Sequence, residues 1–216
     1  MIFGIITHAI HKLNDGQIYA YEPYVREMNL WGKHVDEIFI VAPVSRDKVT
    51  NIEVPYTHDN IRVIEIPSFD ITSFKNGLKS ILVIPKICWL IYKVMKQVNH
   101  VHLRCPGNIG LLGALVQILF PRKSKTVKYA GNWDSKSKQP LSYRLQKWIL
   151  SNTFLTKNCK VLVYGEWEHQ TKNILPFFTA SYKREEIFEV PEKNFSNVIR
   201  FIFVGTFSEG KQPLLS

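Results

Sequence analysis

Cysteine is scarce in this sequence, and no hydrophobic run is long enough to cross a bilayer. The three cysteines, Cys88, Cys105 and Cys159, are far apart and lack metal-ligand spacing, which indicates free thiols in a reducing compartment. The longest apolar stretch, residues 80–95, is interrupted by proline and lysine and falls short of the roughly 20 residues that a spanning helix needs. No basic segment precedes the apolar amino terminus, so we expect a cytoplasmic protein without a signal peptide.

Acidic residues are almost missing from the middle of the chain. Residues 71–165 contain 16 Lys and Arg but one acid, Asp134, whereas residues 1–70 contain 6 basic and 10 acidic residues. A field of one sign indicates an anionic partner, although a solvated basic face is the alternative. The partner could be an anionic membrane surface, reached from the cytoplasmic side, or an anionic ligand. We do not expect nucleic acid, because the chain has no helix-turn-helix, zinc spacing or RNP-like strand.

Two further motifs are missing. No Gly-x-Gly-x-x-Gly follows the first strand, which disfavours a Rossmann dinucleotide site. His8 and His11 lack a carboxylate or cysteine placed to complete a metal shell. We therefore expect neither a cofactor nor a metal.

Most of the chain consists of short apolar runs, in which the period of a strand alternates with the period of a helix. These runs predict strands that alternate with helices. The strands are expected at residues 2–7, 37–42, 61–66, 101–104, 126–130 and 160–164, and the helices at 19–31, 85–98, 110–120, 141–156 and 166–174. Residues 8–17 are interpreted as a polar loop. This alternation predicts an α/β fold, a Rossmann-like parallel sheet with helices on both faces.

The stretch Val101–Gly113 predicts a buried strand, a tight Pro-Gly-Asn turn and the start of a helix that lies close to the sheet at Gly110 and Gly113. In open α/β sheets, ligands bind where such a turn follows the carboxyl end of a strand. His102 and Arg104 lie near that end. His102 is a catalytic candidate, with a buried structural histidine as the alternative.

Two other strand ends carry polar residues. Asp15-Gly16 follows the first strand, and Asn132-Trp133-Asp134 follows the strand at 126–130. An exposed indole beside an amide and a carboxylate suits a sugar ring. A Trp133 that closes the core is the equal alternative.

The helix expected at Pro85–Val98 is amphipathic. Lys86, Trp89, Lys93 and Lys96 share one face, and Ile87, Ile91, Val94 and Val98 share the other. The first set could dock on an anionic membrane surface, and a solvated helix is the alternative.

Two segments resemble the GT-B nucleotide-sugar glycosyltransferases of retaining family 4. The first is Asp15-Gly16 followed by residues 28–35, MNLWGKHV, and the strand 37–43, EIFIVAP. The second is residues 203–211, FVGTFSEGK, which resembles the loop that opens the family's donor domain. The resemblance implies the amino-terminal half of a GT-B fold, with an acceptor-side domain at 1–175, a connection at 176–197, and the first strand and loop of a truncated donor domain at 198–216.

The implied reaction transfers a sugar with retention from a nucleotide-sugar to a glycan or lipid-linked acceptor, in surface polysaccharide or glycoconjugate synthesis. Gly205 and Lys211 would bind donor phosphate, His102 would lie near the transferred sugar, and Asp15, Gly16, Asn132, Trp133 and Asp134 would bind acceptor. The sequence departs from the family at Thr206 and Gln212, and it lacks the donor-site pair of glutamates. We therefore expect this chain alone to be inactive. The alternative is a basic binding or regulatory fragment without catalysis, acting on anionic membrane or nucleic acid.

Overall fold

The computed structural model describes residues 1–67, 74–134, 136–178, 184–189 and 202, and gives only the backbone for residues 74–82. The chain divides into two compact units, Met1–Ser181 and Tyr182–Ser216. The described part of the second unit contains the short helix η2 (Arg184–Glu186). The strand and loop expected at 198–216 lie outside the described residues, apart from residue 202, and so the truncated donor domain stays a prediction.

The described strands of the first unit form one sheet. They are β1 (Ile2–Ile6), β2 (His11–Asn14), β3 (Gln17–Tyr21), β4 (Glu37–Ser45), β5 (Glu53–Pro55), β6 (Ile61–Ile66), β7 (His100–Cys105), β8 (Ser124–Tyr129), β9 (Cys159–Val163) and β10 (Ile174–Pro176). The parallel part runs in the order β6-β4-β1-β7-β8-β9-β10. This is the doubly wound Rossmann order, in which the strand order reverses between β1 and β7.

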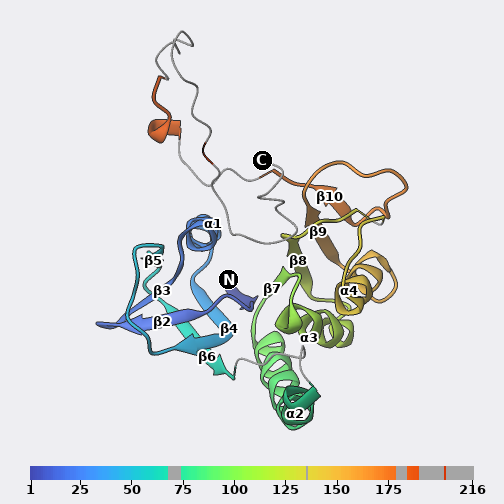
Figure 1. Cartoon of the computed structure of the whole chain (residues 1–216), viewed down its shortest axis with the longest axis horizontal. Coiled ribbons are helices and arrows are strands. Elements are labelled where there is room, and N and C mark those ends of the chain that lie inside the picture. Colours follow the sequence, from blue (N-terminus) through green and yellow to red (C-terminus); the bar gives the residue numbers. More distant parts are fainter. Residues whose placement is uncertain (68–73, 135, 179–183, 190–201, 203–216) are drawn as a thin grey trace. The chain divides into compact units, whose positions relative to one another are not determined.

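Helices cover both faces of this sheet, as the alternation of elements predicts. Helix α1 (Glu22–Gly32) lies on one face, and α2 (Phe74–Gln97), α3 (Asn108–Val116) and α4 (Leu141–Ser151) lie on the other (Figure 1). A 3-10 turn, η1 (Gln117–Leu119), extends α3. The α/β Rossmann-like fold class is confirmed.

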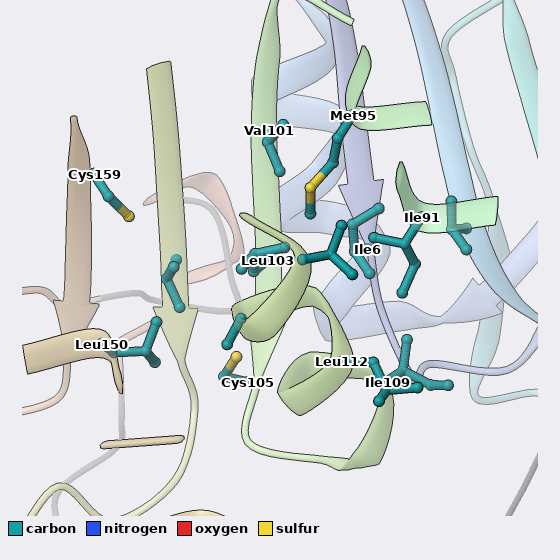
Figure 2. Close-up of a cluster of buried hydrophobic side chains, with 14 of the residues drawn as sticks. Ile6, Ile91, Met95, Val101, Leu103, Cys105, Ile109, Leu112, Leu150 and Cys159 are labelled. Atoms are coloured by element: carbon teal, nitrogen blue, oxygen red, sulfur yellow. The ribbon is translucent and has the colours of Figure 1, made fainter. Parts of the chain in front are cut away.

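Each face has its own hydrophobic core. On the α1 side, Phe3 and Ile5 of β1 and Ile40 of β4 pack against Val25 and Met28 of the helix. On the other side, the odd-numbered residues of β7 meet α2, α3 and α4 (Figure 2). Alternate residues of one strand thus enter different cores, as the pleat requires.

The glycines of α3 let it lie close to the sheet, as expected. A Cβ on Gly110 would lie 2.7 Å from the carbonyl oxygen of Arg104, and one on Gly113 would lie 3.0 Å from Leu103 Cδ2. The first distance is too short for a side chain, and the second would require the Leu103 side chain to shift. The beginning of α3 is therefore held against the end of β7.

The faces of α2 also agree with the sequence pattern, although its start does not. Ile87, Ile91, Val94 and Val98 are buried, and Lys86, Trp89, Lys93 and Lys96 are exposed. The expectation that the helix begins at Pro85 is wrong, because α2 starts at Phe74 and Pro85 lies inside it. A proline inside a helix removes one backbone hydrogen bond. Here the helix continues past Pro85, and Ile87 and Ile91 that follow it are buried in the core.

The expectation of a polar loop at residues 8–17 is wrong. Strands β2 and β3 form an antiparallel hairpin, and Asp15 and Gly16 make its two-residue turn with φ of 48° and 76°. Positive φ at both central residues is typical of the type I′ turn, for which Asp-Gly is a preferred sequence. The hairpin also moves the start of α1 from the expected residue 19 to Glu22.

The helix expected at residues 166–174 is also wrong, because turns lead from β9 to β10 in this segment. His169 has a φ of 56°, which an α-helix cannot accommodate. Thr171 Oγ1 donates to Asn173 Oδ1 at 2.8 Å, and the backbone of Ile174 bonds to the carbonyl of Thr171. Such local bonds compete with helix formation.

Candidate functional site

The candidate site lies where the strand order reverses. After β1 the chain passes to the β2–β3 hairpin and α1 on one face, and after β7 it passes to α3 on the other. In open α/β sheets, ligands bind where two such connections leave in opposite directions at the carboxyl ends of the strands, and we call this edge of the sheet the crevice. His8, Arg104 and the first turn of α3 lie at this edge.

A cluster of three charged residues lies beside the crevice. Arg104 of β7 and Lys128 of β8 are direct partners in the parallel register, so their side chains share the α1 face of the sheet. Arg104 Nη1 donates to Glu27 Oε2 of α1 at 2.9 Å, and Lys128 Nζ donates to the same oxygen at 2.8 Å. The exposed fractions of the three side chains are 16%, 2% and 10% for Arg104, Lys128 and Glu27. One carboxylate oxygen therefore pairs with two cations, which brings two positive side chains together beside the crevice.

Aromatic rings enclose this cluster. The guanidinium of Arg104 lies 5.6 Å from the centre of the Tyr24 ring. The ammonium of Lys128 lies 5.0 Å from the ring of Phe177 and 5.5 Å from that of Tyr164. Rings near a cation stabilise it through their negative faces while they exclude water. The positive charge is thereby held in a place of low dielectric, where it acts strongly on a nearby anion.

His8 connects the cluster with the start of α3. Its imidazole packs over Gly107, where an added Cβ would lie 2.9 Å from His8 Nδ1. Loss of water on this packed side, together with the nearby charge of Arg104, lowers the pKa of His8. The ring is therefore neutral at pH 7 and can donate or accept one hydrogen bond.

The first turn of α3 adds a second positive element. Gly107 is its N-cap and has no side chain with which to cap the helix. The first N–H groups of a helix carry partial positive charge and favour anions. With Arg104, Lys128 and a neutral His8 nearby, this edge of the sheet is suited to a phosphate or carboxylate group.

His102 lies in the interior instead of at the crevice. Its side chain is fully buried, its ring lies near the rings of Phe3 and Trp31, and its Nδ1 is 2.9 Å from Thr126 Oγ1. Burial, together with the nearby charges of Arg104, His100 and Lys128, lowers its pKa to about 3. This environment fits the buried structural histidine that the sequence left as the alternative.

Trp133 is likewise part of a core. It is buried, its ring meets that of Tyr129 edge-on with centroids 4.8 Å apart, and its Nε1 donates to Gln170 Oε1 at 2.9 Å. This burial fits the core-closing Trp133 that the sequence left as the equal alternative to an exposed indole. Asn132 next to it is exposed, and the Asp134 carboxylate accepts a hydrogen bond from the backbone of Lys136. Neither Asn132 nor Asp134 is tied to the charged cluster by a described contact.

The other sequence-predicted residues lie apart from the crevice. Asp15 and Gly16 form the tip of the β2–β3 hairpin instead of a loop between β1 and α1. Lys86, Trp89, Lys93 and Lys96 are on α2, over the opposite face of the sheet from α1. Gly205 and Lys211 lie outside the described residues.

Sequence reasoning missed Glu27, counted Lys128 only among the basic residues of the middle of the chain, and named Arg104 only as a neighbour of His102. Lys128 and Glu27 are 101 residues apart, and no local pattern pairs them. The alternation of polar and apolar residues in β7 and β8 was the available signal. Charged residues at even positions of two strands predict a polar patch on one face of the sheet.

Within the described ranges, no group of three or more His, Cys, Asp or Glu could hold a metal ion, and no helix is both long and apolar enough to cross a membrane. The three cysteines are free thiols, as expected, and Cys105 and Cys159 are buried.

Comparisons with known proteins show little. No protein-family model matches the sequence, and no curated protein matches it significantly. Among solved structures, a UDP-N-acetylglucosamine 2-epimerase resembles it with a TM-score of 0.39 and 10% identity, over 69% of this chain. The match spans 38% of the epimerase chain, well under half of its length. A likeness this distant carries no argument about function, and the class of the chain, a Rossmann-like α/β protein, comes from its own strand order.

Proposed function

We propose that this chain is the acceptor-side part of a nucleotide-sugar glycosyltransferase. The observation that carries the proposal is the placement of two cations, Arg104 and Lys128, around Glu27 near the strand-order reversal, beside the first turn of α3. A sugar nucleotide leaves as an anionic diphosphate, and positive groups that face the developing charge stabilise its departure. The resemblance of residues 15–43 and 203–211 to retaining family 4 supports the same function.

In the proposed reaction, the sugar passes with retention from a nucleotide donor to a glycan or lipid-linked acceptor. Arg104 and the first turn of α3 would face the phosphates, and Lys128 would act through Glu27 by holding Arg104 in place. Neutral His8 would supply one hydrogen bond to the donor or the acceptor. Gly205 and Lys211 stay the proposed donor-phosphate residues of the second unit, and no metal or cofactor is proposed.

Ligand-detected saturation-transfer NMR tests this function. We expect the purified chain to transfer saturation to UDP-glucose, UDP-N-acetylglucosamine or GDP-mannose at millimolar concentration, and inorganic diphosphate to compete. Arg104→Gln should weaken binding about tenfold, the size expected for one charge-assisted hydrogen bond. Lys128 still pairs with Glu27 in this variant, so the fold should be retained.

A matched control for this variant is available on the sheet. Arg62→Gln also removes an arginine paired with a glutamate, because Arg62 Nε is 2.8 Å from Glu37 Oε1, but this pair lies at β6, away from the crevice. Its binding should equal that of the unmodified chain. The proposal would be contradicted if the chain transferred no saturation to any of the three sugar nucleotides. It would also be contradicted if Arg104→Gln and Arg62→Gln weakened ligand binding equally.

A further inference from the structure

The outward side of α2, α3 and α4 exposes large apolar residues beside basic ones. We call this side the helical face and define it by the exposed residues Lys86, Trp89, Tyr92, Lys93 and Lys96 of α2, Leu115 and Leu119 of α3 and η1, and Leu141, Arg144, Leu145 and Trp148 of α4. Helix α3 contacts both α2 and α4, so it is the middle of the face (Figure 1).

The middle of the helical face has no charge. Residues 108–119, which form α3 and η1, contain no Asp, Glu, Lys or Arg. Their inward side packs in the core, while Leu115 and Leu119 point outward. The exposed fraction of Leu119 is 66%. A surface helix normally carries polar residues on its outer side, and a helix that is apolar all round is normally covered.

Aromatic and basic residues flank this apolar middle on both sides. On α2, Lys93 Nζ lies 3.9 Å from the centre of the exposed Trp89 ring, and the ring of Tyr92 contacts that of Phe120. On α4, the exposed positions are spaced so that Arg144, Leu145 and Trp148 share one stripe. The only charged side chains of the three helices are Lys and Arg.

Helix α1, on the opposite face of the sheet, shows the contrast. It carries Glu22 and Arg26 as an ion pair and has one exposed large apolar residue, Leu30. Mixed charge of this kind is typical of a solvated helix. The helical face therefore differs from α1 in carrying charged residues of positive sign only.

From these observations we propose that the helical face docks peripherally on an anionic lipid bilayer. Leucine and tryptophan side chains would enter the headgroup region, and Lys and Arg would lie on the lipid phosphates. A second copy of the chain fits less well, because a two-fold interface would bring two purely basic faces together. Nucleic acid also fits less well, because the leucines at the middle neither stack on bases nor contact phosphate. The proposal is independent of the sugar-nucleotide site, which lies at the strand ends.

Co-sedimentation with vesicles tests the proposal. We expect binding to phosphatidylglycerol-containing vesicles, weaker binding as salt increases, and none to pure phosphatidylcholine. Lys86→Glu with Lys93→Glu should reduce the partition coefficient at least tenfold, because loss of two interfacial lysines alone accounts for about thirtyfold. Leu119→Ser with Trp148→Ser should reduce it by a similar factor while leaving net charge unchanged.

Matched controls come from exposed residues elsewhere. Lys33→Glu with Lys48→Glu makes the same charge change, and Leu13→Ser with Leu30→Ser removes apolar groups of similar exposure, 59% and 61%. Both controls should bind vesicles like the unmodified chain. The proposal is overturned by equal loss in test and control pairs, or by equal binding to anionic and neutral vesicles. It is also overturned if Leu119→Ser abolishes self-association instead of vesicle binding, or if the chain prefers DNA or RNA and only the lysine pair affects binding.

Discussion

Replacing Glu27 by Gln should lower the free energy of unfolding by about 3 to 5 kcal/mol. Glu27 Oε2 accepts hydrogen bonds from both Arg104 and Lys128, and the Lys128 side chain is 2% exposed. Gln cannot supply the negative charge, so two largely buried cations would lose the carboxylate that they share. Urea unfolding of the two proteins at pH 7 measures the difference.

A glutamate that pairs with an exposed arginine provides the control for this prediction. Glu37 pairs with Arg62, whose side chain is 67% exposed, and Glu37→Gln should cost less than about 1 kcal/mol. Adding Lys128→Met to Glu27→Gln should recover part of the lost stability, because it removes one of the two cations that Glu27 pairs with. If Glu27→Gln costs no more than Glu37→Gln, the cluster is not the buried charge assembly described above.

The second large effect is a loss of stability in mild acid. His11 and His102 are both fully buried, and burial lowers the pKa of His11 to about 4 and that of His102 to about 3. In the unfolded chain, a histidine has a pKa of about 6.5 and takes up its proton more readily. Between pH 6.5 and these folded values, the unfolded state therefore binds more protons, and stability decreases as the pH falls.

The hydrogen bonds of His11 explain why its proton is excluded. Nδ1 lies 2.8 Å from the carbonyl oxygen of Ala9, so it donates, and Nε2 accepts from the hydroxyl of Tyr56 at 2.8 Å. A second ring proton would point at the Tyr56 hydroxyl and place a charge in the core. From pH 7.5 to pH 5, each of the two histidines should cost about 2 kcal/mol, or about 4 kcal/mol together.

Urea unfolding at the two pH values measures this loss, and two variants assign it. His102→Gln should remove about half of the pH dependence, whereas His34→Gln, at an exposed histidine, should leave it intact. Equal stability at pH 7.5 and pH 5 would show that the buried histidines accept protons without cost. A pH dependence unchanged by His102→Gln would assign the loss to other groups.

The sheet could be predicted from the sequence because its strands are short apolar runs between turns. The strand–turn–helix of residues 101–113 was also predictable, since the small residues Gly110 and Gly113 allow a helix to lie close against a strand. The β2–β3 hairpin could have been predicted from Asp15-Gly16, which is a typical type I′ turn sequence. The strands on either side of this turn have only four and five residues, too few for a clear alternating pattern.

The candidate site was only partly predictable, for a physical reason. A sequence pattern places Arg104 near a strand end, but it does not show that Glu27 of α1 reaches the same point, because that depends on helix packing. His102 and Trp133 were placed at the crevice from the ends of their strands. Their burial follows from neighbours distant in sequence, such as Phe3 and Trp31 for His102 and Gln170 for Trp133.

The measurement that tests the central proposal most directly is an amide 1H–15N correlation titration of the isotope-labelled chain with UDP-glucose and GDP-mannose to millimolar concentration. We predict that at least one of them shifts the amide signals of His8, Gly107 and Asn108 in a saturable manner, with little change in the β2–β3 hairpin or in α2. Arg104→Gln should reduce these shifts at equal ligand concentration. If these three amides do not move with either ligand, or if the shifts cluster elsewhere in the chain, the crevice at β1 and β7 is not a sugar-nucleotide site.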